Sequence, residues 1–124
     1  MLYKFKNFLE NKETFKNIDG IVRRDVAILA RKLGFTGKTY GFYNINDSDK
    51  SYYEPKNFSK APLENWNDKI HHNRVSAPEQ VQLRMWLISE FDIHVRGDEK
   101  CIKTYDWVLN KNMFEVLTKK LNDK

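Results

Sequence analysis

The sequence predicts an α+β domain: a small antiparallel sheet of about four strands, a largely buried central helix, and flanking N- and C-terminal helices. Three observations lead there. Segments with helical spacing alternate with short segments rich in aromatic and β-branched residues. The strand-like segments come in pairs joined by turn residues, as in hairpins. One helix is apolar over most of its circumference. With 124 residues, the chain is expected to form a single domain, residues 1–124.

Two helices are expected in the first third of the chain. The first spans about residues 3–16, and residues 1–18 are interpreted as an N-terminal addition to the domain. The second follows Asp19, which suits an N-cap, and ends before Gly34, which can take a positive φ. Its core stripe has helical spacing and consists of Val22, Val26, Leu29, Ala30 and Leu33.

A β-hairpin is expected next. Residues 38–45, KTYGFYNI, are rich in strand-forming aromatic residues, residues 46–49 are turn formers, and residues 50–55 form the return strand. Residues 56–75 have no sustained period. They are predicted to be a long loop, which is either functional or holds a short helix at 62–69.

The central helix is expected to start at a capping box. Ser76 and Glu79 have the S-x-x-E spacing, and Pro78 suits the first helical turn. Apolar residues cover two faces of this helix, so it is predicted to be buried scaffold, with an exposed docking helix as the alternative. One face carries Val81, Met85, Ile88 and Phe91, and the other carries Leu83, Trp86 and Leu87.

A second hairpin and a closing helix complete the expected fold. Residues 91–97 and 101–109 have strand-like patterns around a turn at residues 97–100. Cys101 is expected to be a small buried apolar residue in the second strand. Asn112 and Glu115 are predicted to cap the final helix.

Several classes of function are not expected. The sequence contains no zinc-ligand spacing, nucleotide-binding loop or hydrolase motif, so no enzymatic activity, metal or cofactor is predicted. A single cysteine and the lack of an 18-residue apolar run favour the cytoplasm over a membrane.

Positive charge is concentrated near the N-terminus. Residues 1–38 hold nine Lys/Arg and four Asp/Glu, a net +5 that equals the charge of the whole chain. Such a bias suits an anionic partner, either nucleic acid or an acidic protein surface. The predicted basic surface lies on the second helix, although an ordinary solvated face would show the same pattern. It consists of Arg23, Arg24, Ile28, Arg31 and Lys32.

Aromatic residues supply the other candidate contacts. Rings beside lysines on a sheet can stack on unpaired bases, although some of them are expected in the core instead. The hairpin candidates are Tyr40, Tyr43, Tyr52 and Tyr53, and the candidates of the 56–75 loop are Phe58, Trp66, His71 and His72.

The chain resembles a family of small phage and prophage proteins with an A-P-x-Q, W-L and I-H-V pattern. The matching residues are Ala77, Pro78, Gln80, Trp86, Leu87, Glu90, Ile93, His94 and Val95. The composition is similar to that of anti-CRISPR proteins of low-GC hosts. The resemblance implies an inhibitor of a bacterial RNA-guided nuclease, in particular a type VI-B RNA-cleaving effector.

The sequence and the resemblance together predict a non-enzymatic inhibitor in the host cytoplasm. It would bind the CRISPR effector nuclease, or its guide-RNA complex, through the basic surface. The alternative is a phage accessory protein that binds RNA or single-stranded DNA directly. A small catalytic protein is the third possibility.

Overall fold

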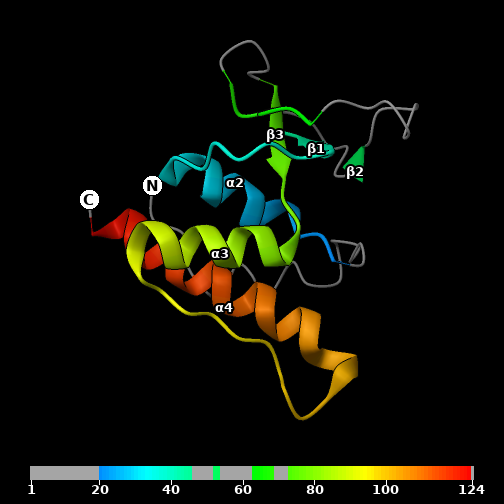
Figure 1. Ribbon diagram of the computed structural model, residues 1–124, viewed down its shortest axis with the longest axis vertical. Coiled ribbons are helices and arrows are strands. Elements are labelled where there is room, and N and C mark those ends of the chain that lie inside the picture. Colours follow the sequence, from blue (N-terminus) through cyan, green and yellow to red (C-terminus); the bar gives the residue numbers. More distant parts are fainter. Residues whose placement is uncertain (1–19, 46–51, 54–62, 69–72, 124) are drawn as a thin grey trace.

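The structure, a computed structural model, describes residues 20–45, 52–53, 63–68 and 73–123. It confirms an α+β fold with three helices and one three-stranded sheet in these ranges (Figure 1). The elements in chain order are α2 (Arg24–Leu33), β1 (Gly41–Asn44), β2 (Tyr52–Tyr53), β3 (Arg74–Ala77), α3 (Gln80–Phe91) and α4 (Ile102–Asn122). The predicted helix at 3–16, the addition at 1–18 and the predicted cap Asp19 lie outside the described residues.

Helix α2 lies at the centre of the fold. Figure 1 shows it between the sheet, toward the top, and α4, and it contacts both α4 and β3. Its apolar stripe is buried as predicted, and Gly34 ends it with a φ of 105°. This left-handed turn lets the N–H of Phe35 donate to the carbonyl of Ala30 at 2.9 Å, which closes the last turn of the helix.

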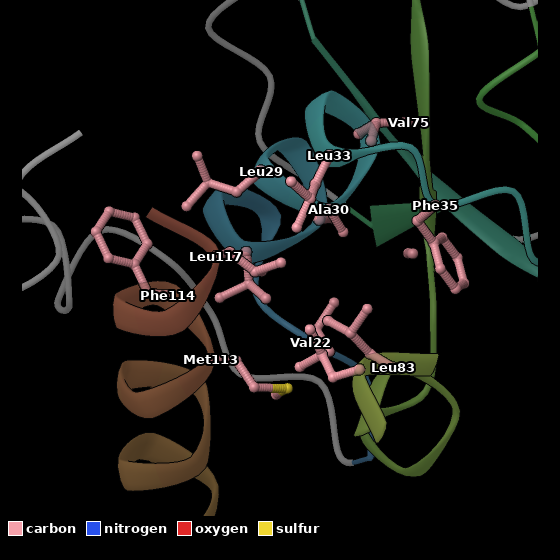
Figure 2. Close-up of a cluster of buried hydrophobic side chains, with 14 of the residues drawn as sticks. Val22, Leu29, Ala30, Leu33, Phe35, Val75, Leu83, Met113, Phe114 and Leu117 are labelled. Carbon is pink, nitrogen blue, oxygen red and sulfur yellow. The ribbon is translucent and has the colours of Figure 1, made fainter. Parts of the chain in front are cut away.

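The hydrophobic core forms where α2, α3, α4 and β3 meet. Figure 2 shows side chains from all four elements converging, with Leu83 of α3 beside Val22. Because α2 buries apolar residues toward both the sheet and α4, it holds the two halves of the fold together.

The sheet has the strand order β2-β1-β3 and is antiparallel throughout. The first predicted hairpin is confirmed, because Phe42 pairs with Tyr53 and Tyr43 with Tyr52. Strand β3 was not predicted. It pairs Gly41 with Ala77 and Asn44 with Arg74, so the end of the predicted loop is part of the sheet.

The predicted capping box is wrong. Ser76 lies in β3 and is buried, and its hydroxyl accepts a hydrogen bond from the backbone N–H of Trp66 at 2.8 Å. Glu79 is the N-cap residue of α3, and its side chain makes no capping hydrogen bond. Pairing of Ser76 with Phe42 in the sheet therefore replaced the local capping interaction.

The predicted second hairpin is also wrong, so the expected four strands become three. Residues 92–101 connect α3 to α4 without forming a strand, and residues 102–122 form one helix. The alternating pattern of residues 101–109 is equally compatible with a helix, since Tyr105, Leu109 and Met113 share one face. The predicted cap Asn112 lies inside α4, where its amide donates to the carbonyl of Arg96.

Helix α3 is buried on one side, which corrects the prediction of a largely buried helix. Leu83 and Leu87 are fully buried, whereas Val81, Met85 and Ile88 are exposed. Among the described residues, no helix has both the length and the apolar character needed to cross a bilayer.

Candidate functional site

The exposed side of α3 carries a row of apolar side chains, which we call the α3 stripe: Val81, Met85 and Ile88. Their exposed fractions are 56%, 64% and 40%. Their spacing of i, i+4 and i+7 places them on one face of the helix. Burying such side chains on binding is favourable, and this spacing is how an amphipathic helix occupies an apolar groove.

Polar contacts on both flanks fix the orientation of α3. The guanidinium of Arg84 donates to the hydroxyl of Tyr105 in α4 at 3.3 Å. The amide nitrogen of Gln82 donates to the carbonyl of Lys38 at 2.9 Å. At the end of the helix Asp92 takes a φ of 54°, its N–H donates to the carbonyl of Ile88 at 2.9 Å, and the N–H of Ile93 donates to the carbonyl of Leu87 at 3.2 Å. The stripe is therefore held outward on a fixed helix.

The aromatic residues of α3 point inward rather than forming an exposed docking face. Trp86 packs edge-on against Phe35 and against Phe91, with ring centroids 5.3 and 5.4 Å apart. Both Trp86 and Phe91 are partly buried against the core. The exposed apolar side chains of α3 are therefore two aliphatic groups and one thioether, and such groups favour contact with an apolar protein surface.

The predicted basic surface on α2 is not one exposed face. Arg24 donates to the carbonyls of Asn44 and Ile45, each at 2.8 Å. Arg31 donates to the carbonyl of Arg74 at 3.2 Å. These guanidinium groups therefore hold α2 to β1 and β3. The prediction placed this face of α2 in solvent. In the structure it faces the sheet, which includes the strand β3 that was not predicted.

The other three residues of the predicted basic surface differ in how far they are exposed. Arg23 is buried, with 2% of its surface exposed, and pairs with Asp25 at 3.1 Å. Ile28 is partly buried and packs against the core. Lys32 is exposed. A partner on the surface of α2 would therefore reach Lys32 but not the Arg23 side chain.

The Arg23–Asp25 pair sits in a site of low polarity. Burial lowers the pKa of Arg23, and the attraction of Asp25 partly opposes this. Burial raises the pKa of Asp25 even though Arg23 and the backbone N–H of Val26 favour the carboxylate. Both directions show that desolvation outweighs the attraction within the pair. The pair therefore belongs to the scaffold rather than to a binding surface.

The side of the sheet away from α2 carries an aromatic and cationic cluster, which we call the sheet platform: Phe42, Tyr53 and Arg74. The rings of Phe42 and Tyr53 stack with their centroids 5.6 Å apart. The Arg74 guanidinium lies 4.5 Å from the centroid of Phe42. Tyr53 was predicted as a binding residue. Phe42 and Arg74 were missed, although the alternation along β1 places Phe42 on the face opposite Tyr43.

The other predicted aromatic residues divide between exposed and internal positions. Tyr40 is 48% exposed. Tyr43 is buried, and its hydroxyl donates to the carbonyl of Val22 at 2.7 Å. Tyr52 is partly buried against the core. Trp66, expected to be exposed in the loop, is 4% exposed and donates its ring N–H to the carbonyl of Thr39 at 3.1 Å.

Phe58, His71 and His72 lie outside the described residues.

The described residues offer few side chains for metal binding or covalent chemistry. No group of three or more His, Cys, Asp or Glu side chains that could hold a metal ion occurs among them. Cys101 is exposed at the start of α4, which corrects its prediction as a buried strand residue. Hydrogen bonding with Thr104 lowers the pKa of the Cys101 thiol.

Comparison of the chain with models of protein families, with curated proteins and with solved structures finds no match.

Proposed function

We propose that this protein is a non-enzymatic, phage-encoded inhibitor that binds a bacterial RNA-guided nuclease through the α3 stripe. The observation that carries the proposal is the exposure of Val81, Met85 and Ile88 on a helix that is otherwise fixed to the fold. The class of target comes from the phage-protein resemblance, and the type VI-B effector is the specific target that we infer.

The chemistry of the stripe favours the protein component of the target over its guide RNA. Contacts with RNA rest on cations at the phosphates and on rings that stack on bases. Val81, Met85 and Ile88 provide neither. An apolar groove on the effector protein would bury all three side chains together, and Met85 at the centre can adapt its shape to such a groove.

A second copy of this chain is a poorer occupant than a groove. Stable protein interfaces bury roughly 1,200–2,000 Å² in total, far more than three side chains on each of two helices supply. A few anchors that enter a pocket can nevertheless dominate binding to a larger partner. We therefore expect Met85 to be the central anchor and Val81 and Ile88 to surround it.

Replacing Val81 and Met85 by aspartate should abolish both binding to the effector and inhibition of its RNA cleavage. Each anchor that contributes about 2 kcal/mol accounts for a roughly 30-fold change in affinity. The measurement is RNA cleavage by the guide-loaded effector, titrated with each variant. Because both residues are exposed, the melting temperature should stay close to that of the original chain.

Ile102→Asp provides the matched control. Ile102 is 96% exposed and lies at the start of α4, outside the stripe. This variant should inhibit as well as the original chain. Full inhibition by the Val81 and Met85 variant would show that the stripe is not the interface, and equal loss in all variants would show a general effect of added negative charge.

Direct binding of RNA or single-stranded DNA is the second candidate function, and the sheet platform favours it. The stacked pair Phe42 and Tyr53, with Arg74 beside it, has the composition of a base-stacking surface. If this function holds, bare RNA should bind with an affinity that falls steeply as salt rises, and Arg74→Ala should weaken it at every salt concentration. An inhibitor that acts through the α3 stripe should show no RNA binding that depends on Arg74.

A further inference from the structure

A cavity of about 470 Å³ lies between the start of α3 and the segment that precedes β1. Its volume is within the range of roughly 300–1,000 Å³ that is usual for small-molecule sites. The lining combines aromatic, apolar and charged groups, and includes Lys38, Tyr40, Tyr52, Leu63, Glu79 and Gln82. None of these residues belongs to the α3 stripe or to the sheet platform.

The wall formed by residues 38–40 is fixed before any ligand arrives. Thr39 is buried, and its backbone exchanges two hydrogen bonds with Glu64, at 2.8 and 3.2 Å. The Thr39 hydroxyl donates to the carbonyl of Gly41 at 2.7 Å, and its own carbonyl accepts from the ring of Trp66. A preorganised wall of this kind lowers the entropic cost of binding.

Two glycines bracket this wall and make room for other lining residues. A Cβ at Gly37 would lie 2.5 Å from the ring of Phe35 and 2.9 Å from the amide nitrogen of Gln82, and a Cβ at Gly41 would overlap the phenol of Tyr52. The sequence GKTYG at 37–41 thus brings Gln82 and Tyr52 close to the backbone of the wall. Gly41 therefore makes room for a cavity-lining side chain, and Gly37 makes room both for Gln82 and for the Phe35 ring of the core.

The polar groups of the lining suit a ligand that donates hydrogen bonds along one edge and carries a negative charge at one end. The Gln82 amide nitrogen donates to the carbonyl of Lys38, and the Gln82 amide oxygen and the Glu79 carboxylate are hydrogen-bond acceptors. Acceptors of this kind suit the amino group of a base. The rings of Tyr40 and Tyr52 suit its flat faces, and the Lys38 ammonium suits a phosphate.

We propose that this cavity binds one nucleoside monophosphate unit whose base carries an exocyclic amino group. The unit is either a free nucleotide or one base of a single strand, because both present the same chemistry. The inference goes beyond the proposed inhibition, which uses a different face of α3.

The test is an NMR titration of the full chain with AMP, CMP, GMP and UMP, followed through the backbone amides of residues 38–41 and the Gln82 side-chain amide. We expect saturable shifts, with at least one amino-bearing nucleotide binding tenfold or more tightly than UMP, which lacks the amino group. Tyr40→Ala should weaken that binding at least tenfold. Tyr40 is half exposed, so this variant should keep its melting temperature.

Lys38→Ala tests the phosphate contact, with Lys100→Ala as the matched exposed lysine outside the cavity. Lys38→Ala should remove the preference for AMP over adenosine, and Lys100→Ala should keep it. A short RNA whose binding depends on Tyr40 would identify a strand as the source of the base. Binding of mononucleotides alone would identify the free nucleotide.

Three results would overturn the inference. They are the lack of saturable shifts with every probe, equal binding of all four nucleotides, and nucleotide binding that depends on Arg74 but not on Tyr40. Inhibition of the nuclease is read separately, so loss of nucleotide binding with intact inhibition would reject the cavity site and leave the proposed function standing.

Discussion

Asp25→Ala is expected to lower the free energy of unfolding by about 3–5 kcal/mol, because it removes the carboxylate that pairs with the buried Arg23 guanidinium at 3.1 Å. Burial already disfavours both charges, as the lowered pKa of Arg23 and the raised pKa of Asp25 show. Asp25 also lies in the first turn of α2, where a negative charge stabilises the helix. Urea denaturation at neutral pH measures the change.

The control for this prediction removes both charges. Arg23→Met combined with Asp25→Ala should unfold less readily than Asp25→Ala alone, because the double variant also removes the buried positive charge that Asp25 stabilises. The backbone N–H of Arg23 keeps its 2.8 Å hydrogen bond to Asn110 in either variant. A loss below about 1 kcal/mol for Asp25→Ala would contradict the prediction, because it would mean that the Asp25 carboxylate contributes little to stabilising the buried Arg23 charge.

Leu83→Ala is expected to cost about 2–5 kcal/mol of stability, since Leu83 is fully buried and its truncation leaves a cavity in the core. Met85→Ala, two residues away on the exposed side, should change stability by less than about 0.5 kcal/mol. Thermal or urea unfolding of the two single variants gives the comparison. A large cost for Met85→Ala together with a small cost for Leu83→Ala would mean that α3 faces the other way.

The sequence predicted α2 and the first hairpin because local signals and tertiary contacts agree there. The core stripe of α2 and the glycine at its end correspond to the buried face and to the left-handed turn in the structure. The aromatic residues of β1 pair with those of β2, as the turn residues between them suggested. Such agreement between levels is what makes an element predictable.

The errors occur where a local pattern has two physical solutions. Ser76 and Glu79 have capping-box spacing, yet Ser76 pairs with Phe42 in the sheet. The alternation after Cys101 suits a strand, yet the same residues continue into the long helix α4. Neither outcome follows from local spacing, because β3 pairs with β1 across thirty or more positions and α4 packs against the distant helix α2.

The candidate site was less predictable than the fold. The concentration of positive charge predicted a binding surface on α2, but Arg24 and Arg31 donate hydrogen bonds to carbonyls of the sheet. The apolar residues of α3 predicted that the helix is buried in the core, but three of them are exposed. A helix apolar on both faces signals either deep burial or a binding surface, and the sequence alone does not separate these outcomes.

Photo-crosslinking from position 85 tests the central claim, that the α3 stripe contacts the effector protein, most directly. A photoreactive amino acid replaces Met85 in one sample and Ile102 in another, and each is irradiated with the guide-loaded effector. We expect a covalent adduct with the effector protein from position 85 and none from position 102. Inhibition without any adduct from position 85, or adducts of equal yield from both positions, would contradict the account.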